Sequence, residues 1–328
     1  MCNNTSVSIL VPVYGVEKFI ERCARSLFEQ TYEHLEYIFV NDCTKDSSIT
    51  ILKDVIERYP NRKPHVRIIE HKHNKGLGGA RNTAVTAATG EFLIHVDSDD
   101  YIDTTCIEKC VLKQKETDAD VVSVDILRFG GVRVITHKIP DFKTPKELNL
   151  AVIKHTIPNN IWGRLIRTSL YKDNQIKVTE GVNMSEDINV LPRLLWYAKK
   201  IANVPEVLCF YDCSNINSYT SSFSESKCIQ GKISREVLNH FFEGKDKEIE
   251  KALKYRATIS IVRALIDCTK YGNHTDFYKK LRSELKLYIN QEIIKELSIA
   301  DRISVLCSNY NLFRIYVKIA SYIKEKTR

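Results

Sequence analysis

The sequence has little of what marks fibrous, disordered or membrane-spanning chains. Glycine and proline contribute only 12 and 8 of its 328 residues, which excludes collagen-like and low-complexity classes. No apolar run approaches the roughly 20 residues that a membrane-spanning helix needs. Ten cysteines lie scattered along the chain, a usage typical of reduced, mostly buried thiols rather than of a disulfide framework. The composition therefore predicts a soluble globular protein.

The N-terminus also lacks the basic and apolar segments of a secretory signal, so we expect a cytoplasmic protein. Lysine and arginine outnumber aspartate and glutamate by 49 to 41, which gives a formal net charge of +8. This balance favours anionic partners such as nucleotides, phosphates or an acidic membrane surface. The length exceeds one average domain, so we expect one catalytic-size domain with an appended piece.

Apolar strand-like runs alternate with amphipathic helical patterns over the first hundred residues. The strand-like runs lie at 7–13, 35–40, 66–69 and 92–96, and the helical patterns at 17–30, 52–59 and 79–88. This alternation predicts an α/β fold with a mostly parallel sheet flanked by helices. Ligands of such sheets bind at the carboxyl ends of the strands, so the residues that follow each strand are candidates for chemistry.

The remainder of the chain reads differently. The pattern after residue 120 is mixed, with strands predicted at 121–124 and 132–136 and a helix at 145–155. From residue 224 onward it is helical, and a C-terminal helix carries an apolar row from Ile303 to Ala320 bordered by basic residues. We therefore predict a domain at 1–223 and a helical appendage at 224–328. The last helix could lie on an anionic membrane, although packing against the domain is the use we favour.

Two common phosphate-binding loops are absent. The turn at 13–17 holds one glycine, where a dinucleotide-binding fold needs Gly-x-Gly-x-x-Gly. The later glycine-rich segment at 76–81 ends on Arg81, and no Gly-Lys-Ser/Thr sequence follows a strand. Neither a dinucleotide fold nor a phosphate loop is therefore predicted.

A cluster of carboxylates, and not a glycine-rich loop, follows the fourth predicted strand. Asp97, Asp99 and Asp100 follow a buried strand, and each close pair repels by about 1–4 kcal/mol unless a cation offsets it. Oxygen ligands of this kind select Mg²⁺ or Mn²⁺. The alternative is an acidic helix N-terminus, with Asp99 or Asp100 as the cap. His71 and His73 could form a metal pair, but solvent or backbone contacts are the commoner use of such residues.

Five short blocks in the chain, taken in order, resemble glycosyltransferase family 2, whose members have the GT-A fold. The blocks are Val11-Pro12-Val13-Tyr14-Gly15, Asn41-Asp42-Cys43-Thr44-Lys45-Asp46, Asn74-Lys75-Gly76 through Ala80-Arg81-Asn82, Asp97-Ser98-Asp99-Asp100 and Glu186-Asp187. No single block is specific to this family, but the five blocks together, in this order, are. The resemblance covers roughly residues 7–222. It departs from the family pattern at Gly15 and at Cys43, where the family has a residue that adopts positive φ freely.

The resemblance implies a nucleotide-sugar site within 7–120 and an acceptor side within 121–223. It implies that Tyr14 lies against the base of the donor and that Asp42 contacts the edge of the base. Arg81 would help to hold the donor, and Asp97 and Asp99 would contact the ribose and the metal-diphosphate. Pro12 and Glu17, in the first turn, would also contribute to donor binding. The metal, Mn²⁺ or Mg²⁺, would be held by Asp99. Such a cation would neutralise the leaving diphosphate as a Lewis acid.

The resemblance also implies that Asp187 is the catalytic base. A carboxylate on the acceptor side would take the proton of the attacking hydroxyl, a contribution of typically 10²- to 10⁴-fold. The alternative for Glu186 and Asp187 is a helix first turn behind Ser185 as N-cap, and both interpretations can hold together. Trp162-Gly163-Arg164 resembles the family's acceptor region or carries a core tryptophan. The polar segment 217–222 could close over the diphosphate or serve as a linker.

The resemblance implies a non-processive, inverting hexosyl- or N-acetylhexosaminyltransferase that moves one sugar to a glycan or lipid-linked acceptor, and we expect a UDP-linked donor. The only tryptophans, Trp162 and Trp196, do not follow arginine, so the Gln-x-x-Arg-Trp block of the processive synthases is absent. The resemblance implies bacterial polysaccharide or cell-envelope glycan assembly in the cytoplasm or at the inner face of its membrane, without a nucleic-acid partner. A nucleotidyltransferase and a nonenzymatic anion- or glycan-binding protein are the alternatives.

Overall fold

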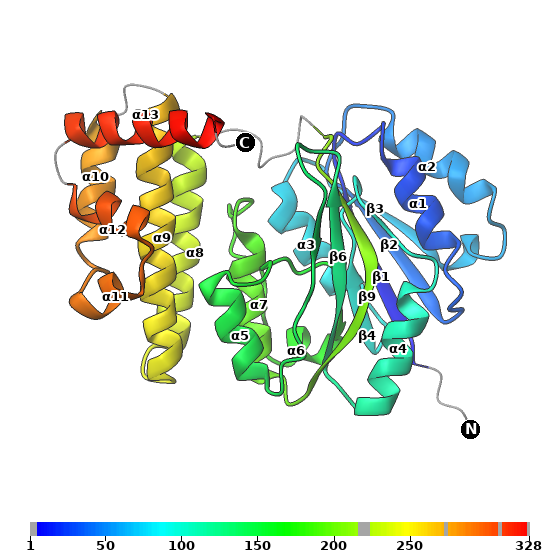
Figure 1. Ribbon diagram of the computed structural model, residues 1–328. Coiled ribbons are helices and arrows are strands. Elements are labelled where there is room, and N and C mark those ends of the chain that lie inside the picture. The colour runs from blue at the N-terminus through cyan, green and yellow to red at the C-terminus, as the bar shows by residue number, and fades with distance from the viewer. Residues whose placement is uncertain (1–4, 216–223, 272–274, 308–309, 327–328) are drawn as a thin grey trace. The chain divides into compact units, whose positions relative to one another are not determined.

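The computed structural model describes residues 5–215, 224–271, 275–307 and 310–326. The chain divides into two compact units, Met1–Val152 with Thr156–Ser221 and Ile153–His155 with Ser222–Arg328. The first unit holds a sheet and its covering helices, and the described part of the second is helical (Figure 1). Each unit has its own hydrophobic core.

One mixed sheet organises the first unit. Its strands are β1 (Val7–Val13), β2 (Leu35–Asn41), β3 (Val66–Glu70), β4 (Phe92–His95), β5 (Tyr101–Ile102), β6 (Val121–Phe129), β7 (Ile135–His137), β8 (Arg164–Arg167) and β9 (Ile201–Asp212). They lie in the order β3-β2-β1-β4-β8-β6-β9-β5, and β7 pairs with β6. The first four in this order are parallel, whereas β8 runs antiparallel to both of its neighbours. The carboxyl ends of β1, β2, β3 and β4 therefore meet along one edge.

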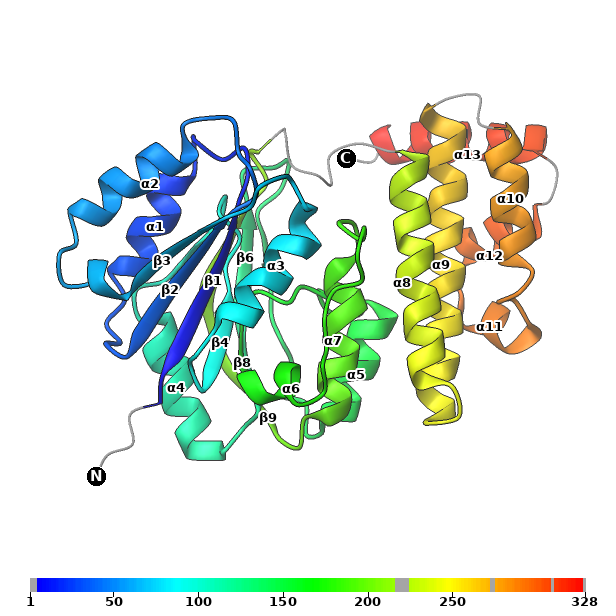
Figure 2. The same ribbon diagram turned by 180° about the vertical axis from the view of Figure 1, so that it is seen from behind.

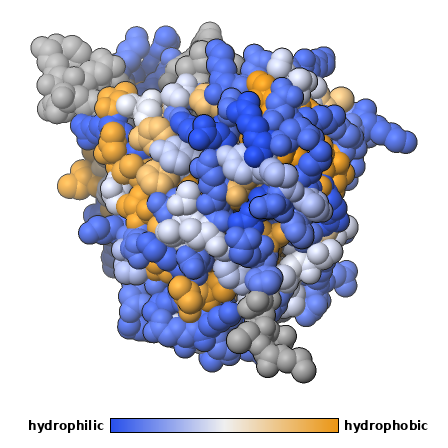
Figure 3. All heavy atoms as spheres, turned by 90° about the vertical axis from the view of Figure 1, so that its right-hand side faces the viewer, coloured by the Kyte–Doolittle hydropathy of each residue, from blue (hydrophilic) through white to orange (hydrophobic). Residues whose placement is uncertain are grey.

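Helices cover both faces of this sheet. They are α1 (Ile20–Phe28), α2 (Ser48–Glu57), α3 (Gly76–Ala87), α4 (Cys106–Thr117), α5 (Pro145–Lys154), α6 (Thr168–Lys172) and α7 (Glu186–Tyr197). One face packs on α1, α2 and α4, and α3 covers the other (Figures 1 and 2). Alternate β1 residues such as Val7, Ile9 and Val11 enter the first of these cores. Seen from the side of α1 and α2, the surface is mostly hydrophilic with separate apolar groups (Figure 3).

The second unit is a helical bundle around one long helix. Its members are α8 (Glu225–Phe242), α9 (Lys247–Tyr271), α10 (Thr275–Leu285), α11 (Gln291–Glu296), α12 (Ile299–Leu306) and α13 (Tyr310–Lys326). Ile261, Val262 and Leu265 of α9 pack with Tyr278 of α10 and Phe313 of α13. Side-chain caps at Ser224, Asn290 and Ser298 begin α8, α11 and α12. Among the described residues, no helix is both long enough and apolar enough to cross a bilayer.

The predicted α/β fold with C-terminal helices is confirmed, with two local corrections. The apolar row from Ile303 to Ala320 does not belong to one helix, because α12 ends at Leu306 and Cys307 has a non-helical ψ of 91°. The alternative that Asp99 or Asp100 caps a helix is wrong, since the next residues form β5 and α4 begins only at Cys106.

The strands beyond residue 120 were the hardest to predict. The strand expected at 132–136 is found at Ile135–His137. β9 is twelve residues long, yet Pro205 and Glu206 interrupt its apolar alternation. They stand where the register with β6 shifts between Val204 and Val207. A bulge of this kind admits proline and obscures the strand pattern.

Candidate active site

Hydrogen bonds from backbone N–H groups to side-chain oxygens connect the turns that follow β1 and β2. The N–H of Gly15 donates to Thr44 Oγ1 at 2.9 Å, and the N–H of Ser47 donates to Glu17 Oε2 at 3.0 Å. Glu17 therefore holds the two turns together. Tyr14 projects from the same turn with 54% of its surface exposed, so its ring is accessible to a ligand at this edge.

Two unusual residues shape these turns without disturbing them. Pro12 is buried in β1 on the same side as Leu10, and the ladder to β4 ends at the pair Leu10 and His95. Its missing N–H therefore faces a place where no strand hydrogen bond is required. Cys43 has a φ of 63°, so it keeps the left-handed conformation expected at its position.

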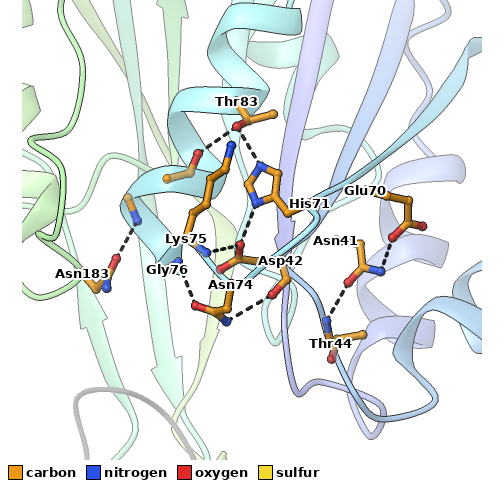
Figure 4. A network of polar contacts seen from close by, with 12 residues as sticks. Asn41, Asp42, Thr44, Glu70, His71, Asn74, Lys75, Gly76, Thr83 and Asn183 are labelled. Carbon is orange, nitrogen blue, oxygen red and sulfur yellow. Dashed lines mark hydrogen bonds and ion pairs between the residues drawn. The ribbon is translucent and has the colours of Figure 1, made fainter.

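A buried network fixes Asp42 at the end of β2 (Figure 4). Its Oδ1 lies 2.7 Å from Nδ1 of His71 and accepts the backbone N–H of Lys75 at 2.8 Å. The second ring nitrogen of His71 contacts the hydroxyl of Thr83 at 2.9 Å. Because both ring nitrogens have protein partners, the network supports a positioning role for His71 rather than the metal pair with His73.

The glycines of α3 allow the segment before α7 to approach its first turn. The N–H of Gly78 donates to Oδ1 of Asn183 at 3.2 Å. A Cβ on Gly78 would lie 2.5 Å from the carbonyl oxygen of Val182. The glycine-rich segment thus serves close packing between two parts of the site, which explains why its spacing matches no phosphate-binding loop.

Replacing Gly78 by alanine is expected to destabilise the first unit by about 1–3 kcal/mol, because the new methyl group would overpack against backbone. Urea unfolding followed by circular dichroism measures this loss. Gly231→Ala in α8 is the matched control: its Cβ would meet nothing closer than 3.6 Å, and alanine is favoured in a helix interior by about 0.5–1 kcal/mol. Equal stability of the two variants would contradict the packing role.

The turn at residues 97–100 follows β4, and we call it the acidic turn. Its carboxylates point in two directions. Asp100 is buried and its Oδ1 accepts the N–H of Asp212 at 2.8 Å, which pins the turn to the end of β9. Asp97 and Asp99 are only partly buried, and Oδ2 of Asp99 accepts a hydrogen bond from Asn215 at 2.9 Å. Burial, followed by repulsion from Asp97, raises the pKa of Asp99.

Arg22 of α1 holds the back of this turn. Its Nη2 donates to the backbone oxygen of Asp99 at 2.8 Å and to Oδ2 of Asp212 at 2.7 Å. The guanidinium also lies over the Tyr101 ring, 4.7 Å from its centroid. The acidic turn is therefore fixed from behind, and its open side carries Asp97 and Asp99.

The acidic turn fits a cation only as part of a larger set of ligands. Within the described residues, no three His, Cys, Asp or Glu side chains gather in a metal-holding group. A cation would nevertheless offset the repulsion between Asp97 and Asp99, which together with burial raises the pKa of Asp99. Mg²⁺ characteristically binds through one or two carboxylates together with substrate phosphates. Asp97 and Asp99 match that donor set.

Arg81 of α3 gathers three carboxylates from two distant parts of the chain. The side chain is 2% exposed. Its Nη2 lies 2.9 Å from Oδ1 of Asp97, 3.4 Å from Oε1 of Glu186 and 3.8 Å from Oδ1 of Asp187. Among the described residues, its Nε and Nη1 are buried without a hydrogen-bond partner. One guanidinium thus joins the acidic turn to the start of α7.

The surroundings of Glu186 and Asp187 set their protonation. Burial raises the pKa of Asp187 to about 6, with Arg81 lowering it and Asp97 raising it. Burial and then the charge of Asp187 raise the pKa of Glu186 to about 8. The buried pair therefore loses its protons at higher pH than free carboxyl groups do, and Asp187 is the more acidic of the two. A base whose pKa lies close to the working pH is well suited to proton transfer.

The residues around Trp162 complete the side of the site next to Asp187. The backbone N–H of Ile161 lies close enough to the Asp187 carboxylate to lower its pKa. The fully buried Arg164 holds this loop by donating to the backbone oxygen of Asn160, and the Trp162 ring stacks on Tyr211 with centroids 5.4 Å apart. Sequence reasoning missed the approach of Ile161 to Asp187, because the position of a backbone group leaves no signal in residue type. The polar segment 217–222 lies outside the described residues.

The sequence and structure of known proteins identify the family. The model of the family described as Glycosyl transferase family 2 matches residues 8–174, about half of the chain. The chain belongs to glycosyltransferase family 2. The glycosyltransferase EpsJ of Bacillus subtilis is 28% identical over 305 residues, which cover 88% of this chain and 86% of EpsJ.

Solved structures of other glycosyltransferases share the fold. TarS residues 1–349 of S. aureus, in complex with UDP-GlcNAc, superpose with a TM-score of 0.73 and 19% identity over 98% of this chain and 92% of that one. The mannosyltransferase PcManGT of Pyrobaculum calidifontis, in complex with GDP-Man and Mn²⁺, gives 0.54 and 15% over 98% and 87%. The GT-A fold expected for this family 2 chain is thereby confirmed.

Proposed function

We propose that this family 2 enzyme moves one sugar from a UDP-linked donor to a hydroxyl of a glycan or lipid-linked acceptor, with inversion and without processive polymerisation. The observation that carries the proposal is the meeting of Asp97 and Asp187 at Arg81, with Oδ1 of Asp97 2.9 Å and Oδ1 of Asp187 3.8 Å from its Nη2. Donor-side and acceptor-side carboxylates are thereby held at one point. Family membership favours glycosyl transfer over nucleotidyl transfer or binding alone.

The donor would lie along the carboxyl edge of the parallel strands. The exposed Tyr14 ring would lie against the base, and Asp42, fixed by His71, would accept a hydrogen bond from its edge. Asp97 would contact the ribose. Pro12 and Glu17 would contribute by shaping the turn that carries Tyr14. A TarS structure contains UDP-GlcNAc, which supports UDP and an N-acetylhexosamine as the first donor to test.

Asp99 would hold Mn²⁺ or Mg²⁺, which would supply Lewis-acid stabilisation of the leaving diphosphate. The chain's own contribution is a fixed base. Asp187 would accept the proton of the acceptor hydroxyl, while Arg81 beside it keeps its carboxylate oriented. Because Arg81 contacts both Asp97 and Asp187, it would hold the donor side and the acceptor side of the site in a fixed position relative to each other.

The relatives support a place in bacterial glycan assembly. TarS of Staphylococcus aureus, described as a poly(ribitol-phosphate) beta-N-acetylglucosaminyltransferase, is 29% identical over 220 residues, 66% of this chain and 37% of TarS. An acceptor that is itself a cell-envelope polymer or a lipid-linked precursor of one is consistent with that likeness. The cytoplasmic location stays a prediction.

Asp99→Asn is expected to abolish the metal-dependent part of donor binding, because it removes the charge that would hold the cation. Thermal unfolding with UDP-GlcNAc and Mn²⁺ measures this, since a donor present at 100 times its Kd adds about 2.7 kcal/mol of stability. The exposed Asp173→Asn is the matched control and should behave like the parent. If metal-dependent stabilisation persisted in Asp99→Asn, other residues would have to hold the cation.

A further inference from the structure

The net charge of the chain is confined to its C-terminal unit. Residues 1–221 contain 28 Lys and Arg and 28 Asp and Glu, so they are neutral. Residues 222–328 contain 21 Lys and Arg against 13 Asp and Glu, a net charge of +8. The positive charge is therefore a property of the helical unit and not of the nucleotide-sugar site. Such asymmetry within one chain indicates an anionic partner for the charged part.

The last two helices of this unit leave apolar side chains exposed. On α13, Leu312, Ile315 and Ile319 are 60%, 54% and 55% exposed. On α12, the exposed apolar side chains are Ile299 at 77%, Ile303 at 42% and Leu306 at 68%. The hydroxyl of Tyr316 donates to the backbone oxygen of Ala300 at 3.2 Å, which links the two helices. We call these six residues the apolar stripes of α12 and α13.

Helix α13 therefore has two apolar sides with different uses. Phe313 and Val317 are buried in the core of the unit, which accounts for the folding of the helix. Leu312, Ile315 and Ile319 are spaced three and four residues apart and lie on another side. Between the two sides project the exposed Arg314 and Lys318. An exposed apolar stripe with cationic residues beside it is the pattern of a helix that lies in a membrane interface.

We propose that the apolar stripes of α12 and α13 dock this protein on a lipid bilayer that contains anionic phospholipid. The aliphatic side chains would enter the boundary between headgroups and acyl chains, and Arg314 and Lys318 would contact lipid phosphates. Each basic residue near such a surface contributes about 1 kcal/mol. The charge of the whole unit adds a longer-range attraction that salt weakens.

The charge argues for a bilayer rather than for a second copy of the chain. A dimer formed through these stripes would bring together two copies of residues 222–328, each with a net charge of +8, and the like charges would repel. An anionic surface would instead be attracted by the same charge. Docking would also bring the enzyme to the layer in which a lipid-linked acceptor resides, although the inference does not depend on the acceptor.

Cosedimentation of the full chain with vesicles tests the proposal. Binding is expected to vesicles of equal parts phosphatidylglycerol and phosphatidylcholine, to fall as salt is added, and to be absent with phosphatidylcholine alone. Arg314→Gln/Lys318→Gln should weaken binding roughly 30-fold, the effect of two basic residues. Ile315→Asn/Ile319→Asn should weaken it at least as much at high salt. Neither pair touches the proposed active site, so UDP release is a separate readout.

Matched substitutions at an exposed hairpin of the first unit provide the controls. Val132 and Val134 are 91% and 68% exposed, and Arg133 and Lys138 are exposed beside them. Val132→Ser/Val134→Ser and Arg133→Gln/Lys138→Gln should bind vesicles like the parent. Equal binding by all variants, or no binding of the parent to anionic vesicles, overturns the proposal. So does a dimer in sedimentation equilibrium that Ile315→Asn/Ile319→Asn dissociates while vesicle binding is unchanged.

Discussion

Replacing Asp187 by asparagine is expected to lower turnover by about 100-fold or more while the affinity for the donor changes little. Asparagine keeps the shape of the side chain, but it cannot take a proton. Steady-state release of UDP in the presence of an acceptor gives the turnover, and titration calorimetry gives the affinity. Unchanged turnover would assign the base to another group.

The neighbouring carboxyl provides the control. Burial raises the pKa of Glu186 to about 8 and that of Asp187 to about 6, so Glu186 is the weaker acid of the pair and Glu186→Gln imitates its protonated form. We expect this variant to keep turnover within a few-fold. If Glu186→Gln lost as much activity as Asp187→Asn, the two carboxyls would have to act as one coupled unit.

The same pKa predicts the acid limb of the pH profile. Asp187 must be ionised to act as the base, so kcat/KM should be full above its raised pKa and fall as the pH drops through about 6. A limb near the ordinary aspartate value would show that the buried environment of Asp187 is not that of the working enzyme.

Arg81→Met is expected to cost about 3–5 kcal/mol of folding free energy, because it removes the cation from a buried group of charges. Asp97, Glu186 and Asp187 all contact Arg81 Nη2 within 3.8 Å. The stability deficit should shrink as the pH is lowered, since protonation of these carboxyls removes the uncompensated charge. Urea unfolding at several pH values measures both effects.

A surface arginine serves as the comparison. Arg67 pairs with Glu36 at 2.6 Å, but its side chain is 46% exposed, and exposed pairs contribute about 0–1 kcal/mol. Arg67→Met should therefore change stability much less than Arg81→Met and with little dependence on acid pH. A deficit in Arg81→Met that is equally large at every pH would point to lost packing instead of lost charge.

Much of this site could be located from the sequence, because the positions of strands in a β–α alternation fix which residues meet. Asp42, Asp97 and Asp99 each follow a buried strand, and parallel strands bring their carboxyl ends to one edge. The order of the five blocks then indicated the family. The sequence also indicated that a helix begins near Glu186, as α7 does.

Other features depended on contacts that no local pattern encodes. Asp187 follows Asp97 by 90 residues, and only packing of α3 against the segment before α7 brings both to Arg81. That packing requires glycine at position 78, because a side chain there would clash with the backbone of Val182. The glycine spacing in the sequence does not indicate this contact. The approach of Ile161 to Asp187 and the pairing of His71 with Asp42 likewise depend on long-range folding.

The sequence by itself determined the alternation of strands and helices, the carboxylates at the strand ends, and the family, because these depend on residue type and order. The tertiary structure alone decided that the pKa values of Glu186 and Asp187 are raised, since burial is the main cause of both shifts. It also decided that the C-terminal apolar row divides between two helices with exposed stripes. Burial and distance belong to the folded chain, and periodicity does not report them.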